Sequence, residues 1–214
     1  LYFNEYTTST WQTGSSMGTA YQAASAKFAT GGSGTAFVAY DFEDTMATPP
    51  QDYQFKVGMY DGSARDTTPT VVYTNASSTI TYYAIAQSDN GRAIVAYVKD
   101  SDDKLYGQYF DGTDWSSETL LNAGDCRNVV ASAVPSSDDF IVSYLVYSTD
   151  QDIHSSRLVS GANGFGWTAA NLGGNYSTSA VLTLKNAADT NGHIVVAVGK
   201  VSGGTYAIDT FVFK

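Results

Sequence analysis

The sequence predicts an all-β fold, and the simplest arrangement is a four-bladed β-propeller with four antiparallel strands in each blade. The composition is poor in strong helix formers, with 9 Leu and 3 Glu in 214 residues. It is rich in residues that suit strands and turns, with 16 Tyr, 10 Phe and 47 Ser plus Thr. In addition, a pattern of strands and tight turns recurs four times at intervals of about 50 residues, as repeat architectures require.

Each repeat is expected to contain four strands joined by hairpin turns. The first strands are rich in Ala and Ser and lie at residues 24–26, 84–86, 131–133 and 179–181. After a turn containing Gly, Asn or Asp, apolar second strands follow at 37–40, 94–97, 141–144 and 194–197. Third strands are expected at 55–60, 105–110, 153–158 and 206–213, and fourth strands from Thr70, Trp115 and Trp167. Small residues suit the first strands because the innermost strands of a propeller crowd around its axis.

The two ends of the chain are expected to close the ring. The last repeat ends after its third strand, and the N-terminal segment 2–13 resembles 109–117, where a third strand gives way to a fourth. Closure would remove free sheet edges. This predicts a single domain, 1–214, with repeats at about 20–75, 76–125, 126–175 and 176–214 plus 1–19. An eight-bladed ring of two chains, a part of a larger propeller and a β-sandwich are the alternatives.

Charge and hydropathy exclude several classes of partner. The formal net charge is −10, so binding to nucleic-acid phosphates is not expected. No stretch reaches the roughly 18 apolar residues of a membrane helix, so no membrane insertion is expected. The single cysteine, Cys126, cannot form an internal disulfide. Because the sequence begins with Leu1 rather than Met, we expect a processed chain or an excised segment.

One repeat contains a segment that resembles the repeats of known protein families. The segment 90–97, followed by 105–115 with its Asp111-Gly112-Thr113-Asp114-Trp115 turn, resembles repeats of bacterial and fungal β-propeller lectins and the Asp-box repeats of sialidase-type propellers. Only half of an Asp box matches, because the preceding Ser-x-Asp is out of register. The resemblance implies a propeller fold with sugar sites between neighbouring blades.

The candidate ligand-binding residues combine aromatic rings with polar companions, since stacking and a few directed hydrogen bonds hold sugars. They are Trp11, Trp115, Trp167, Asp114, Arg92, Arg127 and Arg157. The alternative is that each Trp is a wedge that packs between blades.

Three of the four loops between second and third strands are acidic, and the fourth contains Gly203-Gly204 instead. Oxygen-rich clusters of this kind can bind calcium. The candidate metal ligands are Asp41, Asp44, Asp100, Asp102, Asp103, Asp150 and Asp152. The alternative is that these are solvated turns that favour Asp. No other cofactor is expected.

No catalytic residue is predicted. His154 and His193 lie far apart in the sequence and in no metal-ligand cluster, and the arginines fall at different places in their repeats, which disfavours a sialidase-like triad. The sequence therefore favours a non-catalytic module, secreted or on a cell surface, that is lectin-like or adhesive and binds a glycan or another surface ligand. A propeller glycoside hydrolase and a structural or assembly unit of a larger fibre are the alternatives.

Overall fold

The computed structural model of the chain is all-β, as the sequence predicts. It describes four short N-terminal strands and residues 25–43, 53–63, 66, 68–75, 80–147, 151–161, 164–174, 176 and 179–213. Every regular element in these parts of the chain is a strand. The described residues accordingly include no helix of the length and hydropathy needed to cross a membrane.

Four antiparallel sheets follow one another along the chain, and each keeps its strands in sequence order. The first sheet contains β5 (Ala26–Thr30), β6 (Ala36–Glu43), β7 (Tyr53–Tyr60) and β8 (Thr70–Asn75). The second sheet contains β9 (Tyr83–Gln87), β10 (Ala93–Val98), β11 (Leu105–Phe110) and β12 (Thr119–Asn122).

The third and fourth sheets repeat this order. The third sheet contains β13 (Cys126–Ala133), β14 (Phe140–Val146), β15 (Asp152–Gly161) and β16 (Gly164–Gly173). The fourth sheet has three strands, β17 (Ala180–Ala188), β18 (Ile194–Ser202) and β19 (Thr205–Phe213). Most of the predicted strands are present. The first one, predicted at 24–26, overlaps β5 only at Ala26, because Ala24 lies outside the described residues. β12 begins after Trp115, which forms only an isolated bridge to Phe110.

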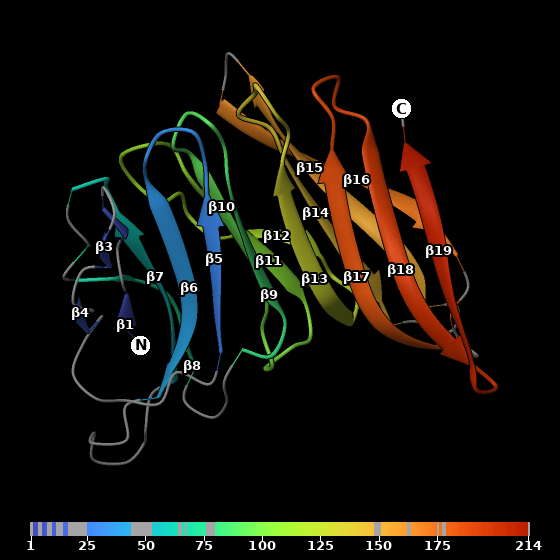
Figure 1. Cartoon of the computed structure of the whole chain (residues 1–214). Coiled ribbons are helices and arrows are strands. Elements are labelled where there is room, and N and C mark those ends of the chain that lie inside the picture. Colours follow the sequence, from blue (N-terminus) through green and yellow to red (C-terminus); the bar gives the residue numbers. More distant parts are fainter. Residues whose placement is uncertain are drawn as a thin grey trace.

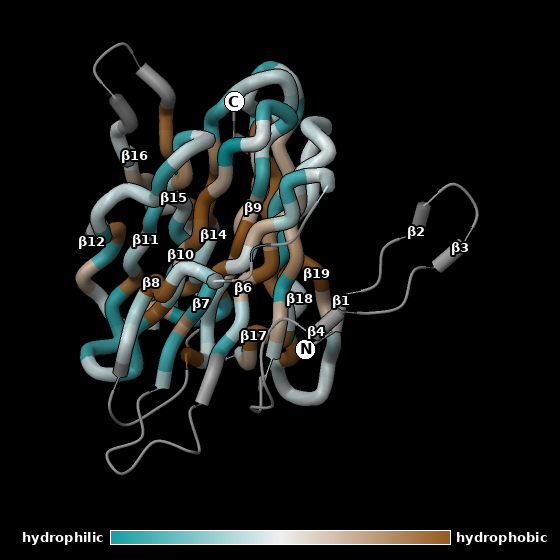
Figure 2. Tube along the Cα trace, turned by 90° about the vertical axis from the view of Figure 1, so that its left-hand side faces the viewer, coloured by the Kyte–Doolittle hydropathy of each residue, from teal (hydrophilic) through white to brown (hydrophobic). Residues whose placement is uncertain are grey.

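The sheets stack face to face, with their first strands side by side (Figure 1). β9 contacts both β5 and β13, and β13 contacts β17. Each pair of neighbouring sheets encloses an apolar cluster. The three clusters include Phe37 and Tyr97, Ile94 and Phe140, and Leu145 and Val198, respectively. Hydrophobic stretches run along the strands and hydrophilic turns lie at their ends (Figure 2). Burial between sheets therefore supplies the core.

Hydrogen bonds link the turns between first and second strands from one sheet to the next. The Gln87 amide donates to Ser33 Oγ at 3.3 Å, which joins the turns of the first and second sheets. Asp138, in the turn of the third sheet, accepts from Ser88 Oγ at 3.0 Å and pairs with Arg92 at 2.9 Å. These contacts fix the ends of the first strands relative to one another.

The expected exchange of strands between the chain ends is not found among the described pairings. β1 (Tyr2–Phe3) pairs with β4 (Ser15–Ser16), and β2 (Tyr6–Thr7) pairs with β3 (Thr10–Trp11). β19 pairs with β18. Pairing within a short segment closes a smaller loop and loses less chain entropy than pairing across the whole chain. Among the described residues the four sheets therefore form a stack, and no closed ring is shown.

Candidate functional site

The two described tryptophans lie between neighbouring sheets. Trp115 is half-buried and packs against Phe110 and Phe37, with ring centroids 5.4 and 6.0 Å apart. Trp167 is half-buried between the second and third sheets, where a Cβ on Gly107 would lie 3.4 Å from its Cζ2. Both rings thus contribute to packing between sheets. Trp11 lies in β3, and its side chain is outside the described residues.

A pocket of about 360 Å³ opens beside Trp115, between the first and second sheets. Its wall and rim come from the described residues Phe37, Val57, Met59, Asp66, Thr70, Phe110, Thr113, Asp114 and Trp115. Phe37, Val57, Met59 and Phe110 come from strands, and Thr70 begins β8. Asp66 follows β7, and Thr113, Asp114 and Trp115 follow β11. Of the sequence-predicted binding residues, the structure brings Trp115 and Asp114 together here.

The turn after β11 determines how Asp114 is presented. Asp111 Oδ1 accepts the backbone N–H groups of Thr113 and Asp114 at 2.8 and 2.9 Å. The Asp114 and Thr113 N–H groups lower the pKa of the Asp111 carboxyl. Gly112 has a φ of 107°, which disfavours a side chain at this position. Asp111 therefore holds the turn, and the exposed Asp114 carboxylate remains at the rim of the pocket.

The opposite side of the pocket is also acidic. Asp66 follows β7, and its N–H donates to Met59 O at 2.6 Å. Its Oδ1 accepts the Thr68 N–H at 2.8 Å. The described lining therefore contains two carboxylates, from different sheets, and no Lys or Arg. Such a lining favours neutral or positively charged ligands over anions.

The three candidate arginines do not line this pocket. Arg92 pairs with Asp138 at 2.9 Å. Arg157 pairs with Asp139 at 2.7 Å and lies against Gly192 of the fourth sheet. Arg92 and Arg157 therefore connect turns. Arg127 lies beside another pocket, at the opposite ends of the strands.

The described candidate metal ligands do not form a metal-binding cluster. Asp41 is buried and accepts the Ile80 N–H at 3.3 Å, and burial raises the pKa of its carboxyl to about 7. Asp102 accepts from the Tyr106 hydroxyl at 2.7 Å. Asp44 and Asp150 are outside the described residues. Where the chain is described, no three His, Cys, Asp or Glu side chains gather in a way that could hold a metal ion.

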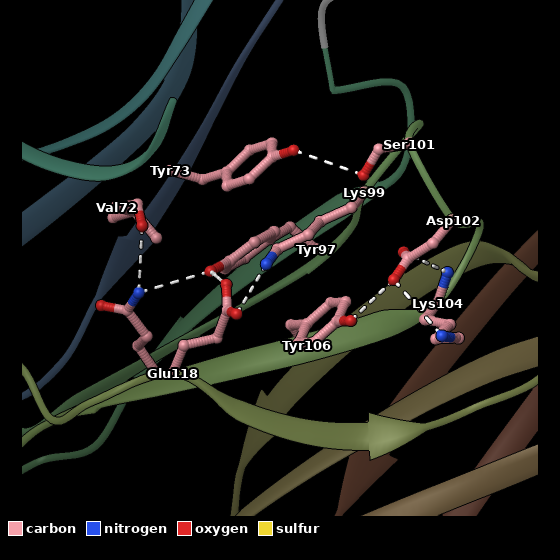
Figure 3. Close-up of polar contacts among 10 residues, drawn as sticks. Val72, Tyr73, Tyr97, Lys99, Ser101, Asp102, Lys104, Tyr106 and Glu118 are labelled. Atoms are coloured by element: carbon pink, nitrogen blue, oxygen red, sulfur yellow. Dashed lines mark hydrogen bonds and ion pairs between the residues drawn. The ribbon is translucent and has the colours of Figure 1, made fainter. Parts of the chain in front are cut away.

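Sequence reasoning missed a cluster around Lys99, between the first and second sheets (Figure 3). The Lys99 ammonium lies 4.8 Å from the Tyr73 ring centroid and 4.0 Å from that of Tyr106, and 2.6 Å from Glu118 Oε1. The Tyr97 hydroxyl also donates to Glu118. Two aromatic faces and a carboxylate would suit an external cation. The chain's own ammonium occupies that position, so the cluster joins the sheets. The three aromatic residues among the six of β11 are its only signal in the sequence.

The thiol and the imidazoles show no catalytic arrangement in the described part of the chain. Cys126 is buried and donates to Gly124 O at 3.2 Å, and burial raises the pKa of its thiol to about 12. His193 contacts Asp189 within its own turn at 2.8 Å. The His154 ring stacks on Tyr144, and burial lowers its pKa. The thiol is therefore protonated and unreactive near neutral pH.

Comparisons with known proteins give a likeness of fold alone. No protein-family model matches the sequence. No curated protein matches it either. A crystal structure of a protein of unknown function from Dyadobacter fermentans is similar with a TM-score of 0.56 at 12% sequence identity. The match covers 89% of this chain and 65% of that one, so this chain spans less than two thirds of its length.

Proposed function

We propose that the protein is a non-catalytic, propeller-type binding module, secreted or on a cell surface, that holds a glycan in the pocket beside Trp115. One observation carries the proposal: an aromatic ring, two carboxylates and two threonines converge on one pocket between the first and second sheets. Sugars present apolar faces that stack on aromatic rings and hydroxyls that bind carboxylates. A volume of about 360 Å³ suits one or two sugar rings.

The proposed fold is a propeller in which each sheet is a blade. Its support is the stacking of four successive sheets, three with four strands and one with three, with their first strands side by side. In a propeller, ligand-binding clefts open between neighbouring blades, and the Trp115 pocket lies between two neighbouring sheets.

The acidic lining also suggests which glycans bind. Asp66 and Asp114 would repel sialic and uronic acids and would accept hydroxyl or ammonium groups. Neutral and amino sugars are therefore the proposed ligands.

A glycan array containing neutral, amino and acidic sugars tests this function. Asp114 is exposed, so Asp114→Ala should leave the fold intact and weaken binding about tenfold through a lost charged hydrogen bond. Asp89→Ala, at an exposed aspartate in the turn between β9 and β10, is the matched control and should bind as wild type does. Absence of binding to every glycan, or binding that Asp114→Ala leaves unchanged, would contradict the proposal.

A glycoside hydrolase is the second candidate, because two carboxylates line the same pocket. Incubation of each bound glycan with the protein, followed by mass spectrometry, separates the two functions. Intact glycans support a binding module. Cleavage that Asp114→Asn or Asp66→Asn abolishes supports the hydrolase.

A further inference from the structure

A second pocket, of about 540 Å³, lies at the opposite ends of the strands from the Trp115 pocket. It is bounded by the starts of β13 and β17, the end of β14 and the residues just outside them. Its described lining consists of Tyr82, Arg127, Asn128, Leu145, Tyr147, Gln151, Ser179, Ala180 and Val181. Of these residues only Arg127 is charged, so the two pockets have opposite character.

One edge of the Arg127 guanidinium donates hydrogen bonds to Asp125. Nε and Nη2 donate to the two carboxylate oxygens of Asp125 at 3.1 and 3.0 Å. Nη1 has no hydrogen-bond partner among the residues that the structure describes. The edge formed by Nη1 and Nη2 is therefore available to a second carboxylate, which guanidinium binds through two parallel hydrogen bonds. Asp125 fixes the orientation of this edge before any ligand arrives.

The aromatic wall of the pocket is fixed by the same residues. The Arg127 guanidinium carbon lies 3.9 Å from the ring centroid of Tyr147 and covers one face of the ring. Tyr147 remains 44% exposed, and its N–H donates to Asp125 O at 2.6 Å. An exposed aromatic ring whose backbone and one face are fixed is a ready stacking surface for a planar or cyclic group.

Two lining residues adopt a backbone conformation that is unusual for residues other than Gly. Asn128 has a φ of 53° and Gln151 a φ of 51°. Asn128 lies where the register of β13 with β14 shifts, between Arg127 and Val130. Strained residues and bulges gather at binding sites because they direct side chains that regular strands could not place. Here they bring two side-chain amides to the same pocket as Arg127.

We propose that this pocket is a second binding site that takes a small carboxylate with a planar or cyclic body. The carboxylate would bind the Nη1 and Nη2 edge of Arg127, and its body would stack on Tyr147. The amides of Asn128 and Gln151 and the hydroxyl of Ser179 supply further donors. This inference is independent of glycan binding beside Trp115, since the two pockets share no lining residue.

Titration of the ¹⁵N-labelled full chain with benzoate tests the proposal, with benzamide as the neutral ligand of the same shape. Benzoate should shift the amide signals of Asn128, Gln151 and Ser179 and bind about tenfold more tightly than benzamide. Arg127→Gln should remove that preference. Arg127 and Asp125 are 38% and 31% exposed, so this change should leave the fold intact, which circular dichroism verifies.

Two control variants separate the possible results. Arg92→Gln removes an arginine of similar exposure outside the pocket and should bind benzoate as wild type does. Asp114→Ala should also retain benzoate binding whether or not it binds a glycan. Equal affinity for benzamide, unchanged affinity in Arg127→Gln, or no shift at the three amides would each overturn the proposal.

Discussion

The second and fourth sheets have the same strand order but differ in how they are covered. All five residues of β9 and all six of β10 are buried. In β19, by contrast, Tyr206 is 77% exposed and Ile208 75% exposed. The second sheet lies between the first and the third sheets. The fourth sheet packs against the third sheet on one face, and no described sheet covers its other face.

The register explains which residues are left uncovered. In β19, Tyr206, Ile208 and Val212 are separated by even numbers of residues, so their side chains point to the same face. Val195 of β18 pairs with Val212 and therefore points to that face too. Strands covered on both faces need near-continuous apolar runs, and strands covered on one face need only alternation. Burial in this molecule therefore depends on the number of neighbouring sheets more than on the strand itself.

The largest expected effect comes from the same substitution in both sheets. Ile94→Ala removes a fully buried side chain and should lower the free energy of unfolding by about 2–5 kcal/mol, because it leaves a cavity between packed sheets. Ile208→Ala removes an exposed one and should change stability by less than about 0.5 kcal/mol. Urea denaturation of both variants measures the difference.

A large loss in Ile208→Ala would contradict this expectation. It would mean that the outer face of the fourth sheet is covered in solution. Measurement at several protein concentrations then shows whether association of chains covers it, because only association makes stability depend on concentration.

The second expected effect comes from Asp41, which is buried in β6 of the first sheet. Burial raises its pKa to about 7 in the folded chain, against an ordinary value of 3.8. Wild type should therefore lose stability as the pH rises from about 4 to 7, because the unfolded chain releases the proton first. Asp41→Asn keeps an acceptor for the Ile80 N–H and should be more stable than wild type by roughly 2–4 kcal/mol at pH 8.

Chemical denaturation of both proteins at several pH values tests whether wild type loses stability as the pH rises. The advantage of Asp41→Asn should shrink as the pH falls and approach zero only below about pH 3, where both the folded and the unfolded wild type hold the proton. An advantage that does not change with pH would show that Asp41 acts through packing and not through its charge.

The strands could largely be predicted from the sequence, but the predicted exchange of strands between the chain ends is not found among the described pairings. Apolar runs between turn-forming residues identify each strand, because alternation and turn chemistry are local properties. The partner of the N-terminal segment depends on competition between a local hairpin and a distant edge. Its resemblance to 109–117 carries no information about that competition.

The candidate site was partly predictable for the same reason. Asp114 and Trp115 are adjacent in one turn, so any fold that forms the turn places them together. Arg92 could not be assigned, since its partner Asp138 belongs to another repeat. Tyr147 and Gln151 gave no signal, because their common pocket arises only when the third and fourth sheets pack.

The smallest expected effect compares the turns of covered and uncovered sheets. Asp138→Ala should cost about 1–3 kcal/mol, because it removes an ion pair with Arg92 and leaves the buried Ser88 hydroxyl without its acceptor. Asp189→Ala is the matched change in the fourth sheet, where the carboxylate accepts only from Asn191 and His193 of its own turn among the described contacts. It should cost clearly less, since no neighbouring sheet loses a contact. Urea denaturation measures the free energy of unfolding of both variants. Equal decreases would mean that each turn stabilises only its own sheet, and that contacts between neighbouring turns do not stabilise the packing of the sheets.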